Sequence, residues 1–142
     1  MFSKACEYGM RATIYIVANC KDGRKIGIKD ICKSIGAPEH FTAKILQELS
    51  KRNIISSTKG PNGGFYVEEN KEITLVDVVL AIDGDKIFTS CGLGITECSN
   101  KKPCPIHYEF KKIRDALKLM LETTSISQVT ENFDRGLVFL KK

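Results

Sequence analysis

Three cysteines and a histidine lie within residues 91–107, whose sequence is CGLGITECSNKKPCPIH. Their spacing is Cys91-x6-Cys98-x5-Cys104-x2-His107. Three thiolates and one imidazole can close a tetrahedral zinc site, and thiolates are also the dominant ligands of iron–sulfur clusters. Zinc sites usually bring cysteines in close Cys-x2–4-Cys pairs, and no such pair occurs here. The wide spacing therefore favours a larger, multi-atom cluster.

The remaining cysteines, Cys6, Cys20 and Cys32, are widely separated on segments that we expect to be helical. Helical cysteines are most often small, buried, apolar residues. Residues 1–8 lack the apolar stretch and cleavage site of a secretory signal, and no apolar run approaches the roughly 20 residues that cross a bilayer. We therefore expect a cytoplasmic protein with no membrane partner, in which thiols stay reduced and clustered cysteines indicate metal or redox chemistry.

The segment that carries the three cysteines must be positioned by its neighbours. Residues 85–104 have no hydrophobic period and are rich in Gly, Cys, Ser and Asn, which predicts a loop about twenty residues long. Residues 74–84 predict a short amphipathic helix, with Thr74 as N-cap and Asp77 in a near-capping box. A loop of this length inside a compact domain is usually functional.

A long helix is predicted from Pro105 to about Thr124, with a charged face and one apolar stripe. The stripe consists of Ile106, Phe110, Ile113, Leu117 and Leu121. Two partners fit it, a second copy of the chain or the helix's own domain.

The net charge of +5 is distributed unevenly. Residues 1–67 hold 11 Lys and Arg against 5 Asp and Glu, whereas residues 68–142 hold 11 against 12. Two interpretations fit the positive excess of the N-terminal half: a surface that binds nucleic acid, or a basic surface that is only solvated.

The basic half predicts a helix over residues 4–20, a second over 28–35 that ends at Gly36, and a third over about 38–52 that begins near Pro38. The third helix is expected to direct four apolar residues inward, Phe41, Ile45, Leu46 and Leu49. Its polar residues, Thr42, Lys44, Gln47, Glu48 and Lys51, are expected on other faces. Two helices joined across a tight glycine-containing turn indicate a helix-turn-helix.

A strand, a turn and a second strand follow directly, at Ile54–Thr58, Gly60–Gly64 and Phe65–Val67. A β-hairpin placed immediately after a helix-turn-helix is the wing of a winged-helix domain. A purely structural hairpin is the alternative.

Three stretches of this chain, ACEYGMRATIYIVA, SSTKGPNGGFYV and the loop ending CPIH, resemble the Rrf2 family of bacterial winged-helix transcription regulators. The resemblance extends in order over nearly the whole chain. It implies a homodimer that binds a palindromic operator in double-stranded DNA. In members with the three cysteines, those of the IscR and NsrR type, it also implies a bound iron–sulfur cluster that modulates DNA binding.

The resemblance assigns roles to individual residues. Cys91, Cys98 and Cys104 match the cluster ligands, with His107 favoured as fourth ligand and Glu7 of the partner subunit as the alternative. The wing motif is matched by Ser57, Lys59, Gly60, Pro61, Gly63 and Gly64. In the recognition helix, FTAKIL carries Ala43 and Lys44 where some cluster-sensing relatives have a glutamate–glutamine pair, so their operator should not be transferred.

These observations predict a mainly α protein with a small β-hairpin. Residues 1–84 are expected to form the winged helix-turn-helix, 85–104 the cluster-binding loop, and 105–142 the dimerisation helix and C-terminal tail. The expected DNA contacts are Thr42, Lys44, Lys51, Arg52, Ser57, Lys59, Gly60, Pro61, Asn62 and Gly63.

We expect a non-enzymatic DNA-binding regulator, acting as a repressor, that senses nitric oxide, redox or iron–sulfur status through a [2Fe-2S] or [4Fe-4S] cluster. One alternative is a cluster-free regulator whose cysteines bind zinc or sense thiol oxidation. A cluster-carrier or electron-transfer protein is the other, and it leaves the wing and the basic half unexplained. The two histidines have no evident partners for catalysis.

Overall fold

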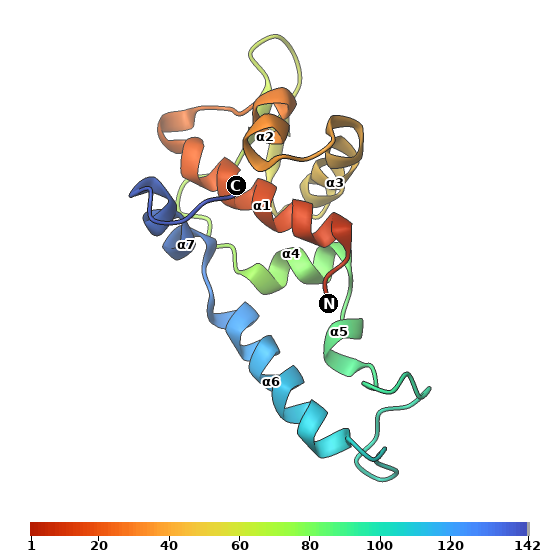
Figure 1. The fold of residues 1–142 in the computed structure, drawn as a ribbon. Helices are drawn as coiled ribbons and strands as arrows, with labels where there is room; N and C mark the ends of the chain where they lie inside the picture. The colour runs from red at the N-terminus through yellow and green to blue at the C-terminus, as the bar shows by residue number, and fades with distance from the viewer. Residues whose placement is uncertain (142) are drawn as a thin grey trace.

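The computed structural model describes residues 1–141 and is mainly α with one small β-hairpin, which confirms the predicted fold class. Its elements are α1 (Lys4–Asn19), the 3-10 turn η1 (Lys21–Gly23), α2 (Ile28–Ile35), α3 (Glu39–Lys51), β1 (Ser56–Thr58), β2 (Gly64–Tyr66), α4 (Leu75–Ile82), α5 (Lys86–Thr89), α6 (His107–Thr123) and α7 (Ile126–Asp134). In Figure 1, α1–α4, the hairpin and α7 gather into one body, and α6 runs away from it toward the loop that follows α5.

The core of the body forms around α1. Ala12 and Ile16 of this helix pack with Ile31 of α2, Leu46 of α3 and Val78 of α4, and each of these side chains is fully buried. Full burial of an aliphatic side chain contributes about 1.5–3 kcal/mol to the free energy of unfolding. Helices α2, α3 and α4 are therefore fixed to α1 by apolar packing.

The helix-turn-helix is formed by α2 and α3. Gly36 ends α2 in the left-handed region, with φ 66°, and its N–H donates to the Cys32 carbonyl. Pro38 is the N-cap of α3 and so lies one residue before the helix that it was expected to begin. The connection is as tight as the sequence predicts.

The orientation of α3 differs from the prediction at two neighbouring residues. Phe41, expected inward, is 41% exposed and packs edge-on against the ring of Tyr8 at 5.8 Å between centroids. Thr42, expected outward, is fully buried. The buried residues of α3 are Thr42, Ile45, Leu46 and Leu49, whose spacing follows one face of a helix. The apolar face therefore includes a threonine, and the phenylalanine lies at its edge.

The wing hairpin is antiparallel and shorter than predicted, with Ser56 opposite Tyr66, Ser57 opposite Phe65 and Thr58 opposite Gly64. The backbone of Phe65 also exchanges two hydrogen bonds of 2.8 Å with Ile26, which anchors the hairpin to the segment before α2. The turn requires glycine at position 63, because a Cβ there would collide with the Thr58 carbonyl oxygen.

Residues 75–82 form the predicted helix α4, and the Thr74 N–H donates to the Asp77 carboxylate at 2.9 Å as in a capping box. The segment expected to be only loop begins instead with one short helix, α5. The long helix α6 begins at His107, two residues after the predicted start at Pro105.

The residues after α6 return to the body and form a further helix, α7, in the segment expected only as a C-terminal tail. Helix α7 lies against α1, and Ile126 is buried in the same core as Ala12 and Ile16. The Ile126 N–H donates to the Ile73 carbonyl at 2.8 Å. Helix α7 (residues 126–134) thus contributes to the core of the body.

The apolar stripe of α6 is divided between two environments. Leu121 is buried and Leu117 half-buried against Val79 of α4, so the C-terminal half of the stripe packs on its own domain. Ile113 is 65% exposed, and Ile106 and Phe110 are also exposed. No helix within residues 1–141 combines the length and the hydrophobicity needed to cross a membrane.

Candidate metal centre and nucleic-acid interface

Cys91 and Cys104 lie at opposite ends of the loop and are close together in space. Cys91 follows α5, Cys104 precedes α6, and their Sγ atoms are 3.6 Å apart. The backbone N–H of Leu93 donates to Cys91 Sγ at 3.4 Å. This N–H is the largest contribution that lowers the pKa of Cys91 below its usual value, because it stabilises the thiolate.

Cys98 is paired with His107. The Cys98 Sγ lies 3.3 Å from His107 Nδ1, and His107 Nε2 lies 2.7 Å from the amide oxygen of Asn100. An amide oxygen can only accept, so Nε2 carries a proton, and in the neutral ring the lone pair of Nδ1 then faces Cys98. The ring is 4% exposed and is therefore held in this orientation. Metal-ligating histidines usually donate their other ring N–H to an oxygen, and the hydrogen bond from His107 to Asn100 follows this pattern.

The four side chains form two pairs. Within residues 1–141, no three or more His, Cys, Asp and Glu side chains gather into one group that could hold a metal ion. A backbone hydrogen bond nevertheless connects the two pairs, because the His107 N–H donates to the Cys104 carbonyl at 3.0 Å. Arg114 donates to the Ser90 carbonyl at 2.7 Å and to Cys98 Sγ at 3.2 Å.

Asn100 and Arg114 were not among the residues singled out in the sequence. One signal pointed to Arg114: the buried residues of α6 are His107, Arg114 and Leu121, spaced seven residues apart. A charged residue at heptad spacing between a candidate ligand and a core leucine shares their face. For Asn100, inside an aperiodic loop, the sequence holds no comparable signal.

Glu7, the alternative fourth ligand, lies in the first turn of α1 and forms an ion pair with Lys4 at 3.1 Å. No hydrogen bond or ion pair described for residues 1–141 joins it to the loop of its own chain. Cys6 and Cys32 are buried, as expected for helical cysteines, and burial raises the pKa of Cys6 to about 12. Cys20 is half-buried.

The side chains of Lys44, Lys51 and Arg52 are exposed on α3 and at its C-terminal end. Arg52 Nε donates to Glu48 at 2.9 Å, which orients the guanidinium along the helix. The hydroxyls of Ser50 and Ser57 are 3.1 Å apart and connect α3 with the first wing strand. Helix and wing thus present their polar groups as one surface.

The predicted wing contacts are accessible. Ser57, Lys59, Gly60, Pro61 and Asn62 are exposed and Gly63 is half-buried. Thr42 is a correction to the predicted interface. Its side chain is fully buried beneath α3 and its hydroxyl has no hydrogen-bond partner, so it is not available to DNA.

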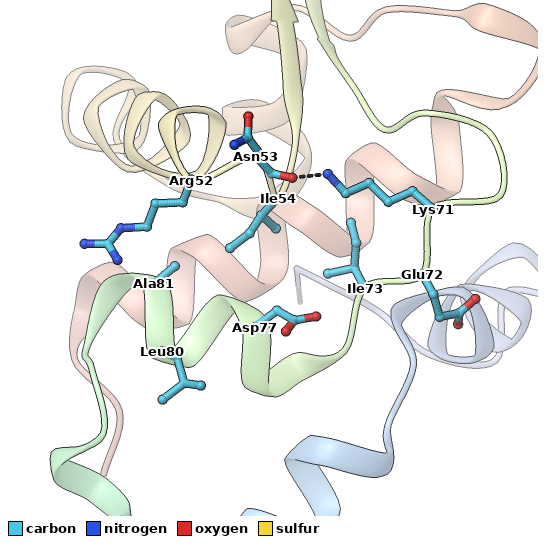
Figure 2. Close-up of a pocket in the computed structure, with 9 residues that line it drawn as sticks. All are labelled: Arg52, Asn53, Ile54, Lys71, Glu72, Ile73, Asp77, Leu80 and Ala81. Atoms are coloured by element: carbon cyan, nitrogen blue, oxygen red, sulfur yellow. Dashed lines mark hydrogen bonds between the residues drawn. The ribbon is translucent and has the colours of Figure 1, made fainter.

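A cavity of about 390 Å³ lies between the end of α3 and α4. Figure 2 shows Arg52 and Lys71 projecting at its two sides, and the Lys71 ammonium donates to the Asn53 carbonyl. The cavity shares Arg52 with the predicted interface, but none of its lining residues comes from the cysteine loop.

Comparison with known proteins places these features in a family. The model of Rrf2, "Iron-dependent Transcriptional regulator", matches residues 2–132. A putative HTH-type transcriptional regulator of Aquifex aeolicus is 30% identical over 132 residues, covering 91% of this chain and 90% of that protein. The transcriptional regulator IscR of Photorhabdus laumondii is 23% identical and covers 88% and 76%.

Two solved structures share the fold. T. potens IscR has a TM-score of 0.75 at 15% identity, covering 97% of this chain and 91% of that one. CymR, the global cysteine regulator of B. subtilis, has a TM-score of 0.74 at 20% identity, covering 92% and 96%. The resemblance read from the sequence is confirmed: because the family model spans the winged helix, the cysteine loop and α6 together, this chain belongs to the Rrf2 family of transcriptional regulators.

Proposed function

We propose that this regulator is a homodimeric repressor whose DNA binding is controlled by an iron–sulfur cluster held by Cys91, Cys98, Cys104 and His107. The observation that carries the proposal is the pairing of these side chains at the N-terminal end of α6. Cys98 Sγ lies 3.3 Å from His107 Nδ1, and Cys91 Sγ lies 3.6 Å from Cys104 Sγ.

The donor set suits such a group. Three thiols and one imidazole nitrogen with a free lone pair are ligands that iron–sulfur clusters accept. Asn100 holds the proton on His107 Nε2, which keeps Nδ1 available as the fourth ligand. When bound, the cluster would supply iron sites that react with nitric oxide or oxygen.

The DNA step follows from the exposed cations of α3 and the wing. The recognition helix would enter the major groove, where Lys44 and Lys51 reach bases or phosphates. Lys59 at the wing tip would contact the adjacent backbone. The hydrogen bond between Ser50 and Ser57 holds the wing in a fixed position relative to α3.

The coupling between the two sites runs through α6. The loop leads directly into this helix. Ile106, which precedes the helix, and Phe110 and Ile113 in its N-terminal half are exposed and available to a second copy. A change in the loop would shift α6 and hence the spacing of two winged helices, and half-sites about 34 Å apart tolerate little change.

The test is the visible absorption spectrum and the iron and sulfide content of protein purified anaerobically. The proposal predicts a coloured protein with iron and acid-labile sulfide in wild type and with neither in Cys104→Ala. Colourless wild-type protein free of iron would contradict it. His107→Ala and Glu7→Ala, compared in parallel, identify the fourth ligand by which of the two loses the cluster.

A cluster-free thiol sensor is the second candidate, and the Cys91–Cys104 distance favours it specifically. A disulfide has about 2.05 Å between its sulfurs, and the two thiols already lie 3.6 Å apart. This candidate predicts colourless protein. Added hydrogen peroxide would take two electrons and two protons from the two thiols, giving water and a disulfide that links residues 91 and 104 in a peptide map. Zinc in place of iron in the purified protein would indicate a structural metal site instead.

A further inference from the structure

Arg114 is a buried cation without a carboxylate partner. It lies on α6 and is 8% exposed, and none of the ion pairs among residues 1–141 includes it. One terminal nitrogen donates to the Ser90 carbonyl at 2.7 Å and to Cys98 Sγ at 3.2 Å. Its Nε is buried and has no acceptor.

This environment is unfavourable for a guanidinium. Arginine keeps its charge at every accessible pH, and burying a charge is costly unless an opposite charge compensates for it. The Ser90 carbonyl, the Cys98 thiol and the Phe110 ring, whose centroid lies 5.9 Å from the guanidinium carbon, stabilise the cation but carry no full negative charge.

The carboxylate of Asp115, which is adjacent to Arg114 in the chain, is paired with Lys111 and does not contact the guanidinium. Of the groups that do contact it, the one that can become an anion is the Cys98 sulfur, which would be charged when it ligates iron. The hydrogen bond from Arg114 would then be charge-assisted and stronger.

We propose that Arg114 is the counter-charge of the cluster site: it compensates the thiolate of Cys98 and holds the loop on α6 through Ser90. The inference rests on the proposed cluster function and assigns to it a residue outside the ligand set. Arg114 is a positioning residue, because it acts on the group through Cys98. Its position one heptad after His107 places it on the buried face of the same helix.

If Arg114 is the counter-charge, its removal should affect the protein without a cluster and the protein with a cluster in opposite directions. Without a cluster, Arg114 is a buried charge that lacks an anion, so removing it should leave the apo protein as stable or raise its melting temperature. With a cluster, removing it should weaken retention by about 10- to 100-fold, the usual effect of losing an outer-sphere partner.

The experiment compares Arg114→Gln and Arg114→Lys with the matched control Lys112→Gln, which removes an exposed cation from the same helix. Each protein is reconstituted anaerobically with iron and sulfide, and the rate of cluster loss to a chelator is followed at visible wavelengths. The melting temperature of each apo protein is measured in parallel. We expect fast loss from Arg114→Gln, an intermediate rate from Arg114→Lys, which keeps the charge, and wild-type behaviour from Lys112→Gln.

Wild-type retention in Arg114→Gln would overturn the inference while leaving the proposed function intact. Equal losses in Arg114→Gln and Arg114→Lys would overturn the role of charge, because the lysine retains it. An apo melting temperature that falls in both Arg114 variants along with cluster retention would show a merely structural role. Wild-type protein that takes up no cluster would overturn the inference and the proposed function together.

Discussion

His107 Nδ1 lies 3.3 Å from Cys98 Sγ although nine residues separate them in the chain. The contact depends on the other ring nitrogen, whose proton is engaged by Asn100 at 2.7 Å. The tautomer of a candidate ligand is thus set by a residue that has no ligand role.

Asn100→Ala should therefore weaken cluster retention by about 10-fold, because the ring loses the partner that orients it. Asn100→Asp retains an acceptor for Nε2 and should behave like wild type. The rate of cluster loss to a chelator is the measurement, with the exposed neighbour Lys101→Ala as control. Retention in Asn100→Ala equal to that in the control would show that His107 needs no second partner.

Lys59→Ala tests the wing as a phosphate contact. The slope of log affinity against log salt falls by about one unit per lost phosphate contact, so a dimer with two wings should lose about two. Lys112→Ala, which removes an exposed cation of α6, should leave the slope unchanged. A wild-type slope in Lys59→Ala would mean that the wing does not touch the DNA backbone.

Thr42→Val distinguishes a buried threonine from a DNA contact. The Thr42 hydroxyl is buried without a partner, and an unsatisfied buried hydroxyl costs about 1–3 kcal/mol. The valine variant should be more stable by roughly 1 kcal/mol in chemical denaturation and should bind DNA with unchanged affinity. Lys44→Ala, on the exposed face of the same helix, should instead weaken binding. Loss of affinity in Thr42→Val would restore Thr42 to the interface.

At Phe41 and Thr42, the polarity of the side chain and its position around the helix predict opposite burial. Treating polar residues as exposed placed Thr42 outside, but positions 42, 45, 46 and 49 form a regular stripe that includes it. Arg114 was not predicted to be buried for the same reason, because only apolar residues were assigned to the buried face. Its spacing of seven residues from both His107 and Leu121 places it on that face.

Local signals predicted the elements whose ends carry glycine, proline or a capping residue, such as α2, α4 and the hairpin. They could not predict that α7 packs on α1, because its placement depends on contacts between residues more than 100 positions apart. The pairing of Cys91 with Cys104 and of Cys98 with His107 is likewise tertiary, since an aperiodic loop has no spacing rule that specifies it.

Ile113→Glu tests whether the exposed part of α6 is the dimer interface. Ile113 is 65% exposed, so a charge there should leave the fold intact, whereas Leu117 packs partly on its own domain and is a poorer site. Loss of an apolar contact worth about 1.5–3 kcal/mol per buried side chain should weaken dimerisation by at least roughly 10-fold. We expect the wild type to sediment as a dimer and Ile113→Glu to sediment as a monomer at the same concentration.

Glu122→Lys is the matched control, because residue 122 is exposed and lies half a turn away from Ile113 around the helix. It should sediment as wild type does. An intact dimer in Ile113→Glu would exclude this face as the interface and leave the exposed apolar residues of α6 without that function.

In the proposed function the state of the cluster controls DNA binding, and one anaerobic titration tests this control most directly. Holo protein bound to DNA selected from a random library by that same protein is titrated with nitric oxide, while the visible spectrum and the fluorescence anisotropy of the DNA are recorded together. We predict that the cluster band bleaches and the affinity changes over the same range of nitric oxide, and that Cys104→Ala shows neither response. If Cys104→Ala bound this DNA with the wild-type affinity and responded to nitric oxide as the wild type does, the cluster would not be the switch.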